Sequence, residues 1–150
     1  MRIALGSDHG GFLLKSEIKK HLEEKGIEFE DMGCFSTESV DYPDIGQAVG
    51  EAIVRGEFDK GIICCGTGIG ISISANKVPG IRAALCGDCF SAKASREHND
   101  ANVLALGERV IGVELAKMIV DVWLSSEFLG GRHGRRVGKI AKIEEKYFNK

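Results

Sequence analysis

An almost wholly apolar run of six residues, Lys60–Cys65, leads directly into the segment Cys65-Gly66-Thr67-Gly68-Ile69-Gly70. A short apolar run of this kind is typical of a strand buried on both faces of a parallel sheet. Helical spacing follows over residues 71–77, so the segment predicts a strand–loop–helix unit with glycines where the backbone turns. A chain built around this unit is expected to be an α/β protein whose loop lies at the C-terminal edge of the sheet.

Strand-like and helix-like segments alternate along the rest of the chain. Strands are predicted over residues 2–7, 27–32, 61–65, 81–86 and 103–106. Helices are predicted over residues 11–25, 43–55, 71–77, 90–98, 113–125 and 136–148. This alternation favours a mostly parallel sheet with helices on both faces. Because the 150 residues contain no linker or internal repeat, one domain over residues 1–150 is expected.

Composition argues against several other classes of protein. A net charge of −2 gives no reason to expect a nucleic-acid or membrane partner. No apolar run approaches the roughly 20 residues of a membrane-spanning helix, and Asp8 comes too early for a signal peptide. The five cysteines are an odd number in a chain that is not a small disulfide scaffold. We therefore expect a cytoplasmic protein with reduced thiols.

Cys65 is the strongest candidate for a reactive side chain, because it stands where the predicted strand ends and the glycine loop begins. Loop amides and the start of the next helix favour negative charge at this point. Such surroundings make thiolate available as a base or a nucleophile. Alternation along the strand turns Cys64 to the opposite side, where it is expected to act as a small buried hydrophobic residue.

Three further polar segments are candidates for ligand binding. Asp8 and His9 follow the first predicted strand, where they suit acid–base chemistry or contacts with hydroxyls and phosphate, although Asp8 alternatively caps the next helix. The segment Asp41-Tyr42-Pro43-Asp44 is too polar to be simple core filling. The basic residues 130–136 favour a small phosphorylated ligand, because arginine binds phosphate through two parallel hydrogen bonds.

Two alternatives to an enzyme built on Cys65 remain open at this stage. Cys86 and Cys89 have CxxC spacing, which suits a dithiol redox protein, whereas the second ligand pair of a zinc site is missing. The glycine loop alone also suits a non-catalytic module that binds nucleotide or phosphate. His98 lies in a polar turn and, taken alone, is more often structural than catalytic.

Together these segments resemble the family of type B ribose-5-phosphate isomerases and galactose-6-phosphate isomerase subunits. The resemblance covers nearly the whole chain and rests on segments 6–11, 41–43, 65–70, 75–77, 98–99, 102–103 and 130–133. It implies a single-domain, three-layer α/β/α fold with a Rossmann-like five-stranded parallel sheet. It also implies an enzyme of the pentose phosphate pathway that interconverts ribose 5-phosphate and ribulose 5-phosphate, with no redox cofactor and no obligatory metal.

The same resemblance assigns roles to individual positions. Cys65 matches the base that moves a proton between C2 and C1, and His98 matches a residue that helps to open the sugar ring. Thr67 matches a group that stabilises the enediolate, and Asp8 matches one that contacts the sugar hydroxyls. Matched substrate-binding positions are His9, Tyr42, Gly66, Gly68, Ile69, Gly70, Asn99, Arg109, Arg132 and Arg136.

The family also implies how chains assemble. Its arginines come from the partner subunit, so the active unit is expected to be a homodimer or tetramer with shared active sites. The last predicted helix, residues 136–148, is expected to contribute to the dimer. Allose 6-phosphate and unphosphorylated aldoses stay open as further substrates.

Overall fold

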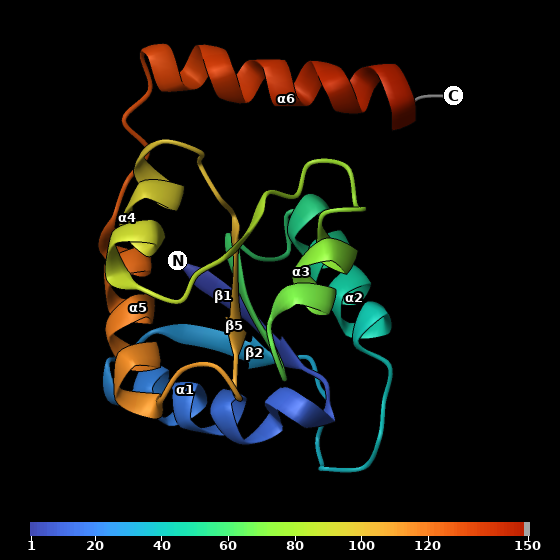
Figure 1. Ribbon diagram of the computed structural model, residues 1–150, viewed down its shortest axis with the longest axis vertical. Coiled ribbons are helices and arrows are strands. Elements are labelled where there is room, and N and C mark those ends of the chain that lie inside the picture. The colour runs from blue at the N-terminus through green and yellow to red at the C-terminus, as the bar shows by residue number, and fades with distance from the viewer. Residues whose placement is uncertain (149–150) are drawn as a thin grey trace.

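The computed structural model describes residues 1–148, which form a five-stranded parallel sheet with helices on both faces (Figure 1). The strands are β1 (Arg2–Ser7), β2 (Glu28–Asp31), β3 (Lys60–Cys65), β4 (Ala83–Leu85) and β5 (Val103–Gly107). Their spatial order is β2-β1-β3-β5-β4. This arrangement confirms the predicted fold class, a three-layer α/β/α structure.

The helices are α1 (Phe12–Glu24), α2 (Tyr42–Val54), α3 (Ile69–Ala75), α4 (Cys89–Glu97), α5 (Val113–Ser125) and α6 (Arg132–Phe148), with a short 3-10 turn η1 (His9–Gly11) before α1. Helices α1, α4 and α5 cover one face of the sheet, and α2 and α3 cover the other. Apolar residues recur at helical spacing on α1, at Leu14, Ile18 and Leu22, so one face of that helix is buried. Among the described helices, none is long and apolar enough to cross a membrane.

Strand β3 separates two apolar cores because its side chains alternate between the faces of the sheet. Ile62 and Cys64 pack in the core beneath α1 and α5, whereas Ile63 and Cys65 pack in the core beneath α2 and α3. Cys64 is fully buried, and this burial holds the pKa of its thiol well above the usual range. The prediction that Cys64 acts as a buried hydrophobic residue is confirmed.

Strand β4 is shorter than the predicted residues 81–86. Ile81 is buried in the core before the strand begins. The backbone amides of Arg82 and Ala83 donate to side-chain oxygens, Asn102 Oδ1 at 2.8 Å and Asn76 Oδ1 at 2.7 Å. Side chains thus satisfy two backbone amides at the start of β4, which is an edge strand of the sheet.

Helix α6 begins at Arg132, four residues before the predicted start at residue 136. Gly130 and Gly131 both adopt left-handed φ values, 68° and 58°, and turn the chain into the helix. The polar, glycine-containing segment that follows is therefore helical rather than a loop. One consequence is that Arg132 and Arg136 lie one turn apart on the same face of α6.

Helix α6 stands apart from the body of the molecule (Figure 1). None of its residues, all within the described part of the chain, is buried. Ile140 and Ile143 are 41% and 59% exposed, although such side chains are usually covered. Its contact with the body includes Gly80, whose amide donates to both carboxylate oxygens of Glu144 at 3.1 Å.

Candidate active site

The C-terminal ends of β1, β3 and β5 lie side by side. Ser7 is in register with Cys64, and Cys65 is in register with Gly107. After β1 the chain continues to β2 on one side, whereas after β3 it continues to β4 on the opposite side of the sheet. In open α/β sheets, ligands bind at such a topological switch point. We call this region the cysteine edge; it comprises Asp8, His9, Tyr42, the loop 65–70 and Arg109.

Cys65 is 4% exposed, and its Sγ accepts a hydrogen bond from the Gly68 amide at 3.0 Å. Gly68 has a φ of 77°, and a Cβ at this position would lie 2.9 Å from the Leu106 carbonyl carbon. Only glycine fits both the left-handed backbone and the close approach. The loop therefore curls back over the sulfur and aims an amide donor at it, which stabilises negative charge on Sγ.

The turn after β5 closes the other side of this loop. The Glu108 amide donates to the Cys65 carbonyl at 3.0 Å, and the Arg109 amide donates to the Gly66 carbonyl at 2.9 Å. A Cβ at Gly66 would lie 3.4 Å from Arg109 Nη1, so the guanidinium lies beside the loop. Thr67 is exposed, and its Oγ1 accepts from the Ile69 amide at 3.2 Å. The structure thus brings Cys65, Thr67 and Arg109, three of the expected site residues, close together.

Asp8 and His9 lie next to this loop. Asp8 is 6% exposed, and its Oδ1 accepts from the Gly11 amide at 3.1 Å, so the alternative capping role is real. His9 Nδ1 lies 3.1 Å from the Val40 amide nitrogen and 3.2 Å from the Val40 carbonyl oxygen, so either tautomer of the ring can bond to the Val40 backbone. These contacts leave His9 Nε2 free of the Val40 backbone. No sequence pattern signalled this contact, because Val40 contributes only its backbone.

Tyr42 completes the cysteine edge from the start of α2. Its ring lies so close to Gly70 that a Cβ there would be 2.7 Å from Cε2. Tyr42 and His9 line a cavity of about 460 Å³ with Asp8, Ser39, Val40, Asp41, Pro43 and Asp44. Polar groups from two separate segments, residues 8–9 and 39–44, therefore surround one hollow, which is the usual form of a small-molecule site.

His98 and Asn99 lie at the opposite edge of the sheet. Helix α4 runs back from the end of β4, and His98 caps its C-terminus with an amide bond to the Ala94 carbonyl at 2.8 Å. Nearby, the Asn102 carbonyl accepts from Gly61 at the start of β3. The length of β5, roughly 13 Å for four strand steps, separates this edge from Cys65. Within one chain the structure therefore does not bring His98 and Cys65 together.

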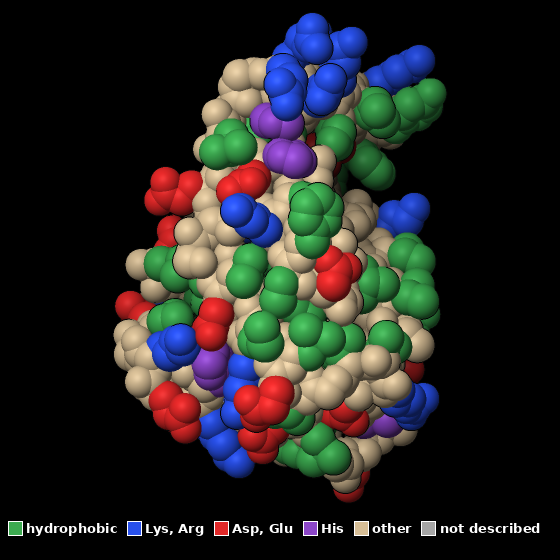
Figure 2. All heavy atoms as spheres, turned by 60° about the vertical axis from the view of Figure 1, so that its left-hand side comes forward, with side chains coloured by type: hydrophobic (Ala, Val, Ile, Leu, Met, Phe, Trp, Pro, Cys, Tyr) green, Lys and Arg blue, Asp and Glu red, His purple; other side chains and the backbone are tan. Residues whose placement is uncertain are grey.

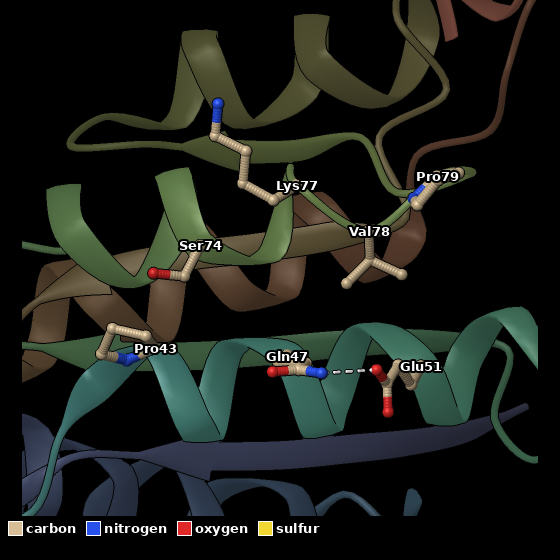
Figure 3. Close-up of a pocket in the computed structure, with 7 residues that line it drawn as sticks. All are labelled: Pro43, Gln47, Glu51, Ser74, Lys77, Val78 and Pro79. Carbon is tan, nitrogen blue, oxygen red and sulfur yellow. Dashed lines mark hydrogen bonds between the residues drawn. The ribbon is translucent and has the colours of Figure 1, made fainter. Parts of the chain in front are cut away.

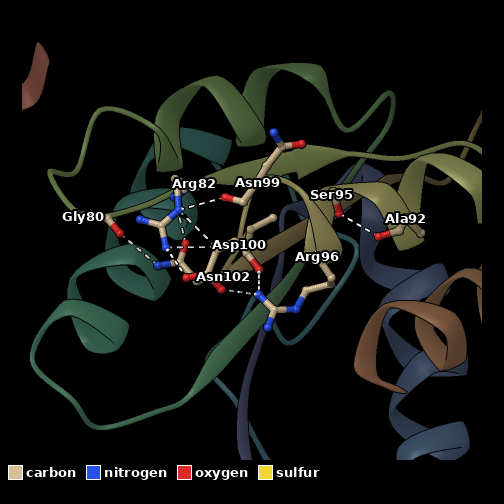
Figure 4. A network of polar contacts seen from close by, with 9 residues as sticks. Gly80, Arg82, Ala92, Ser95, Arg96, Asn99, Asp100 and Asn102 are labelled. Carbon is tan, nitrogen blue, oxygen red and sulfur yellow. Dashed lines mark hydrogen bonds and ion pairs between the residues drawn. The ribbon is translucent and has the colours of Figure 1, made fainter. Parts of the chain in front are cut away.

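The turn that carries His98 is fixed by a polar network (Figure 4). Arg82 donates to the carbonyls of Asn99 at 3.2 Å and Asp100 at 2.9 Å. Arg96 donates to Asp100 Oδ1 at 3.0 Å and to the Ala101 carbonyl at 2.6 Å. Asp100 adopts a left-handed φ of 48°, which these contacts hold in place. His98 and Asn99 consequently lie on a rigid turn.

His133 stacks on His98, with ring centroids 4.3 Å apart and an interplanar angle of 8°. Lys and Arg side chains gather at this end of the molecule beside two adjacent histidines (Figure 2). Loss of solvent, then the nearby His98, Arg132 and Arg136, lowers the pKa of His133. His133 was not among the expected site residues, although it lies within the matched segment 130–133. We call His98, Asn99, Arg132, His133 and Arg136 the histidine edge.

A separate groove between α2 and α3 has a volume of about 410 Å³ and is lined by Pro43, Gln47, Glu51, Ser74, Lys77, Val78 and Pro79 (Figure 3). It contains none of the predicted site residues. Gln47 Nε2 donates to Glu51 Oε1 at 2.7 Å within it, so those polar groups satisfy each other. In residues 1–148, no group of three His, Cys, Asp or Glu side chains is arranged to hold a metal ion.

Cys86 and Cys89, the basis of the redox alternative, are both free thiols. Cys86 is 1% exposed. Burial raises the pKa of its thiol, against a smaller opposing effect of a hydrogen bond from Ser95. A reactive dithiol needs an accessible thiolate, so this environment disfavours the redox alternative.

Comparison with known proteins agrees with this geometry. The model of the Ribose/Galactose Isomerase family matches residues 3–140. Ribose-5-phosphate isomerase B of Escherichia coli is 55% identical over 145 residues, covering 97% of this chain and 97% of that protein. D-erythrulose-4-phosphate isomerase of Pectobacterium atrosepticum is 46% identical over 145 residues, covering 96% and 95%. The solved ribose-5-phosphate isomerase B of Clostridium thermocellum superposes with a TM-score of 0.97 at 62% identity, covering 98% and 99%.

The fold and the cysteine edge thus define an α/β enzyme with a polar cavity of about 460 Å³ and a buried thiol at the C-terminal ends of its strands. The chain belongs to the ribose/galactose isomerase family, and it is an isomerase.

Proposed function

We propose that this chain interconverts D-ribose 5-phosphate and D-ribulose 5-phosphate, with Cys65 as the base. The observation that carries the proposal is the buried Cys65 Sγ with the Gly68 amide aimed at it from 3.0 Å. The names of the Escherichia coli and Clostridium thermocellum proteins support the choice of substrate.

In this mechanism the Cys65 thiolate removes the proton from C2 of the open-chain aldose. The electron pair of the broken C–H bond forms the C1–C2 double bond, and the carbonyl electrons move to O1. Amides of the loop 66–70 and the Thr67 hydroxyl stabilise the resulting enediolate. Asp8 moves a proton between O1 and O2, and the Cys65 thiol returns its proton to C1. The same proton leaves and re-enters, so no redox cofactor is required.

Phosphate binding and ring opening need groups from both edges. His9 and Arg109 at the cysteine edge are positive or donor groups suited to phosphate. We propose that a second copy of the chain supplies its histidine edge to the same cavity, so that His98 opens the ring and Arg132 and Arg136 bind phosphate. Asn99 then lines the pocket from the partner side.

The shape of α6 supports this shared site. None of its residues in the described chain is buried, yet Ile140 and Ile143 give it an apolar side. Packing α6 on a second copy would cover this side and carry Arg132 and Arg136 across. We accordingly propose a homodimer, or a tetramer of such dimers, in which residues 1–150 of each chain form one domain; residues 149–150 lie outside the described part.

The proposal is tested by isomerisation of ribose 5-phosphate in metal-free buffer, with Cys65→Ala compared with Cys64→Ala. Loss of a positioned base is expected to lower kcat by about 10²–10⁴-fold. Cys64→Ala is the matched control, because it removes the same thiol one residue away on the other face of the sheet. Full activity in Cys65→Ala would overturn the proposed role of this thiol. Phosphate binding without turnover of any sugar phosphate by the wild type would favour the binding-module alternative.

The same assay also resolves the range of substrates. Because His9 and the arginines are proposed to recognise phosphate, unphosphorylated ribose is expected to react with a kcat/KM lower by at least about tenfold. Allose 6-phosphate tests whether the cavity accepts a sixth carbon. D-erythrulose 4-phosphate, the substrate named for the Pectobacterium relative, tests a shorter chain.

A further inference from the structure

Lys15 on α1 is a lysine without exposed surface. A buried ammonium is unfavourable unless it is paired and hydrogen-bonded. None of the steps described above uses this side chain. The contacts of its ammonium group therefore indicate which part of the structure Lys15 holds in place.

The Lys15 ammonium joins α1 to the end of β2. Its Nζ donates to Asp31 Oδ1 at 2.8 Å and to the Cys34 carbonyl oxygen. Lys15 Nζ also lies over the rings of Phe12 and Phe35, 5.4 Å from each centroid. Asp31 is the last residue of β2, so the ammonium fixes the turn formed by residues 31–34.

The turn 31–34 is hydrogen-bonded to the end of β1, the strand that directly precedes Asp8. The Gly33 amide donates to Asp31 Oδ1 at 3.0 Å. The Ser7 amide donates to the Gly33 carbonyl at 2.7 Å, and the Cys34 amide donates to the Ser7 carbonyl at 2.6 Å. Ser7 immediately precedes Asp8 and His9, so the turn holds the backbone from which both site residues project.

The same turn also begins the segment that reaches the site from the other side. Residues 35–41 run from Cys34 to α2, and the backbone of Val40 in this segment contacts His9 Nδ1. Tyr42 follows at the start of α2 and packs on Gly70. The turn 31–34 therefore precedes, along the chain, two contacts at the cysteine edge. These are the contact of Val40 with the His9 ring and the contact of the Tyr42 ring with Gly70.

We propose that Lys15 is a positioning residue for the sugar-phosphate site, acting through the turn 31–34 on His9 and Tyr42. The proposal rests on the proposed function for its kinetic consequences but not for its effect on the His9 ring. Replacing both partners of a buried ion pair by uncharged side chains of similar volume is often no worse for stability, whereas removing one partner leaves an unpaired buried charge. The ammonium is the group that can bridge Asp31 and the Cys34 carbonyl at once.

The test compares Lys15→Met with Lys19→Met by steady-state kinetics, at a temperature where both variants are folded by circular dichroism. Lys19 is a matched control, because its Nζ lies 3.8 Å from Asp31 Oδ2 while its side chain is 42% exposed. A misplacement of about 1 Å can lower activity by about 10²-fold. Lys15→Met is therefore expected to lower kcat/KM for ribose 5-phosphate by about 10- to 100-fold, mostly through KM, and Lys19→Met by less than about twofold.

A second variant separates positioning from stability. Lys15→Met/Asp31→Asn removes the uncompensated carboxylate and is expected to recover thermal stability without recovering KM. Recovery of both would show a merely structural role and overturn the proposal. Unchanged kinetics in folded Lys15→Met would overturn it as well.

The His9 ring gives a readout that does not depend on turnover. In nitrogen-15 NMR spectra, with His9→Gln used for assignment, Lys15→Met is expected to shift the His9 Nδ1 signal as the Val40 bond weakens, and Lys19→Met is expected to leave it in place. If the wild type isomerises nothing but the signal shifts, the proposed function fails while the positioning role stands. If the signal does not move, the positioning role fails whatever the activity.

Discussion

The cysteine edge and the histidine edge are built in different ways. At the cysteine edge, backbone amides and carbonyls of neighbouring loops bond directly to one another, and the Cys65 side chain is 4% exposed. At the histidine edge, His98 rests on a rigid turn, but Arg132 and Arg136 project from a helix with no buried residue in the described chain. One half of the predicted site is complete in a single chain, and the other half is displayed toward solvent.

This difference follows from where each edge obtains its stability. Buried polar groups must be satisfied within the fold, so the loops of the cysteine edge are fixed as the chain folds. An exposed amphipathic helix gains most of its stability from packing on an apolar surface. The histidine edge is therefore expected to depend on a second chain, and three experiments test this difference between the two edges.

The largest effect is expected from combining one defect at each edge. Cys65→Ala and His98→Gln are each expected to lower kcat by about 10²–10⁴-fold as pure variants. A heterodimer with Cys65→Ala on one chain and His98→Gln on the other can be isolated with two different affinity tags. If each site takes Cys65 from one chain and His98 from its partner, one site then has both defects and the other has neither. Because a two-fold dimer has two equivalent sites, about half of the wild-type activity per dimer is expected. A heterodimer as inactive as its parents would mean that each site is built within one chain.

An intermediate effect is expected from adding a methyl group at each edge. Gly68→Ala forces a left-handed residue with a Cβ into contact with Leu106, which should lower the free energy of unfolding by at least about 1–3 kcal/mol. A Cβ at Gly138 on α6 would meet no atom within 4 Å. Gly138→Ala is therefore expected to raise stability by about 0.5–1 kcal/mol through helix propensity. Urea unfolding measures both values, and equal effects would contradict the contrast in packing.

The smallest effect is expected from the pH dependence of the histidine edge. Loss of solvent, followed by the nearby His98, Arg132 and Arg136, lowers the pKa of His133 below the usual 6.5, and Glu97 has a smaller opposite effect. In the window just below pH 6.5 the unfolded chain then binds more protons at this residue than the folded chain. The contribution of His133 to unfolding free energy therefore falls as the pH falls through this window.

His133→Gln is the variant that checks this sign. Thermal unfolding midpoints measured between pH 5 and 7 are expected to fall less steeply with acid in His133→Gln than in the wild type. Salt is expected to reduce the difference, because the charges involved are exposed. A steeper dependence in the variant would mean that protonated His133 is stabilising.

Much of the cysteine edge could be predicted from sequence because its signals are local. The apolar run before Cys65, the glycines after it and the polar residues after the first strand each mark a strand end. Parallel strands place their C-terminal ends together, so these groups had to meet once the α/β alternation was recognised. The Val40 contact to His9 and the Lys15 anchor had no local signal, because one uses only backbone and the other pairs residues from separate elements.

The α/β class, the opposite orientation of Cys64 and Cys65, and most members of the cysteine edge can be inferred from the sequence alone. Tertiary structure, by contrast, sets the strand order and the early start of α6. Side-chain periodicity and glycine placement act within a few residues, whereas the choice of neighbouring strands depends on how whole elements pack. Once β3 and β5 pair in parallel, His98, which precedes β5, lies a full strand length away from the thiol at the end of β3.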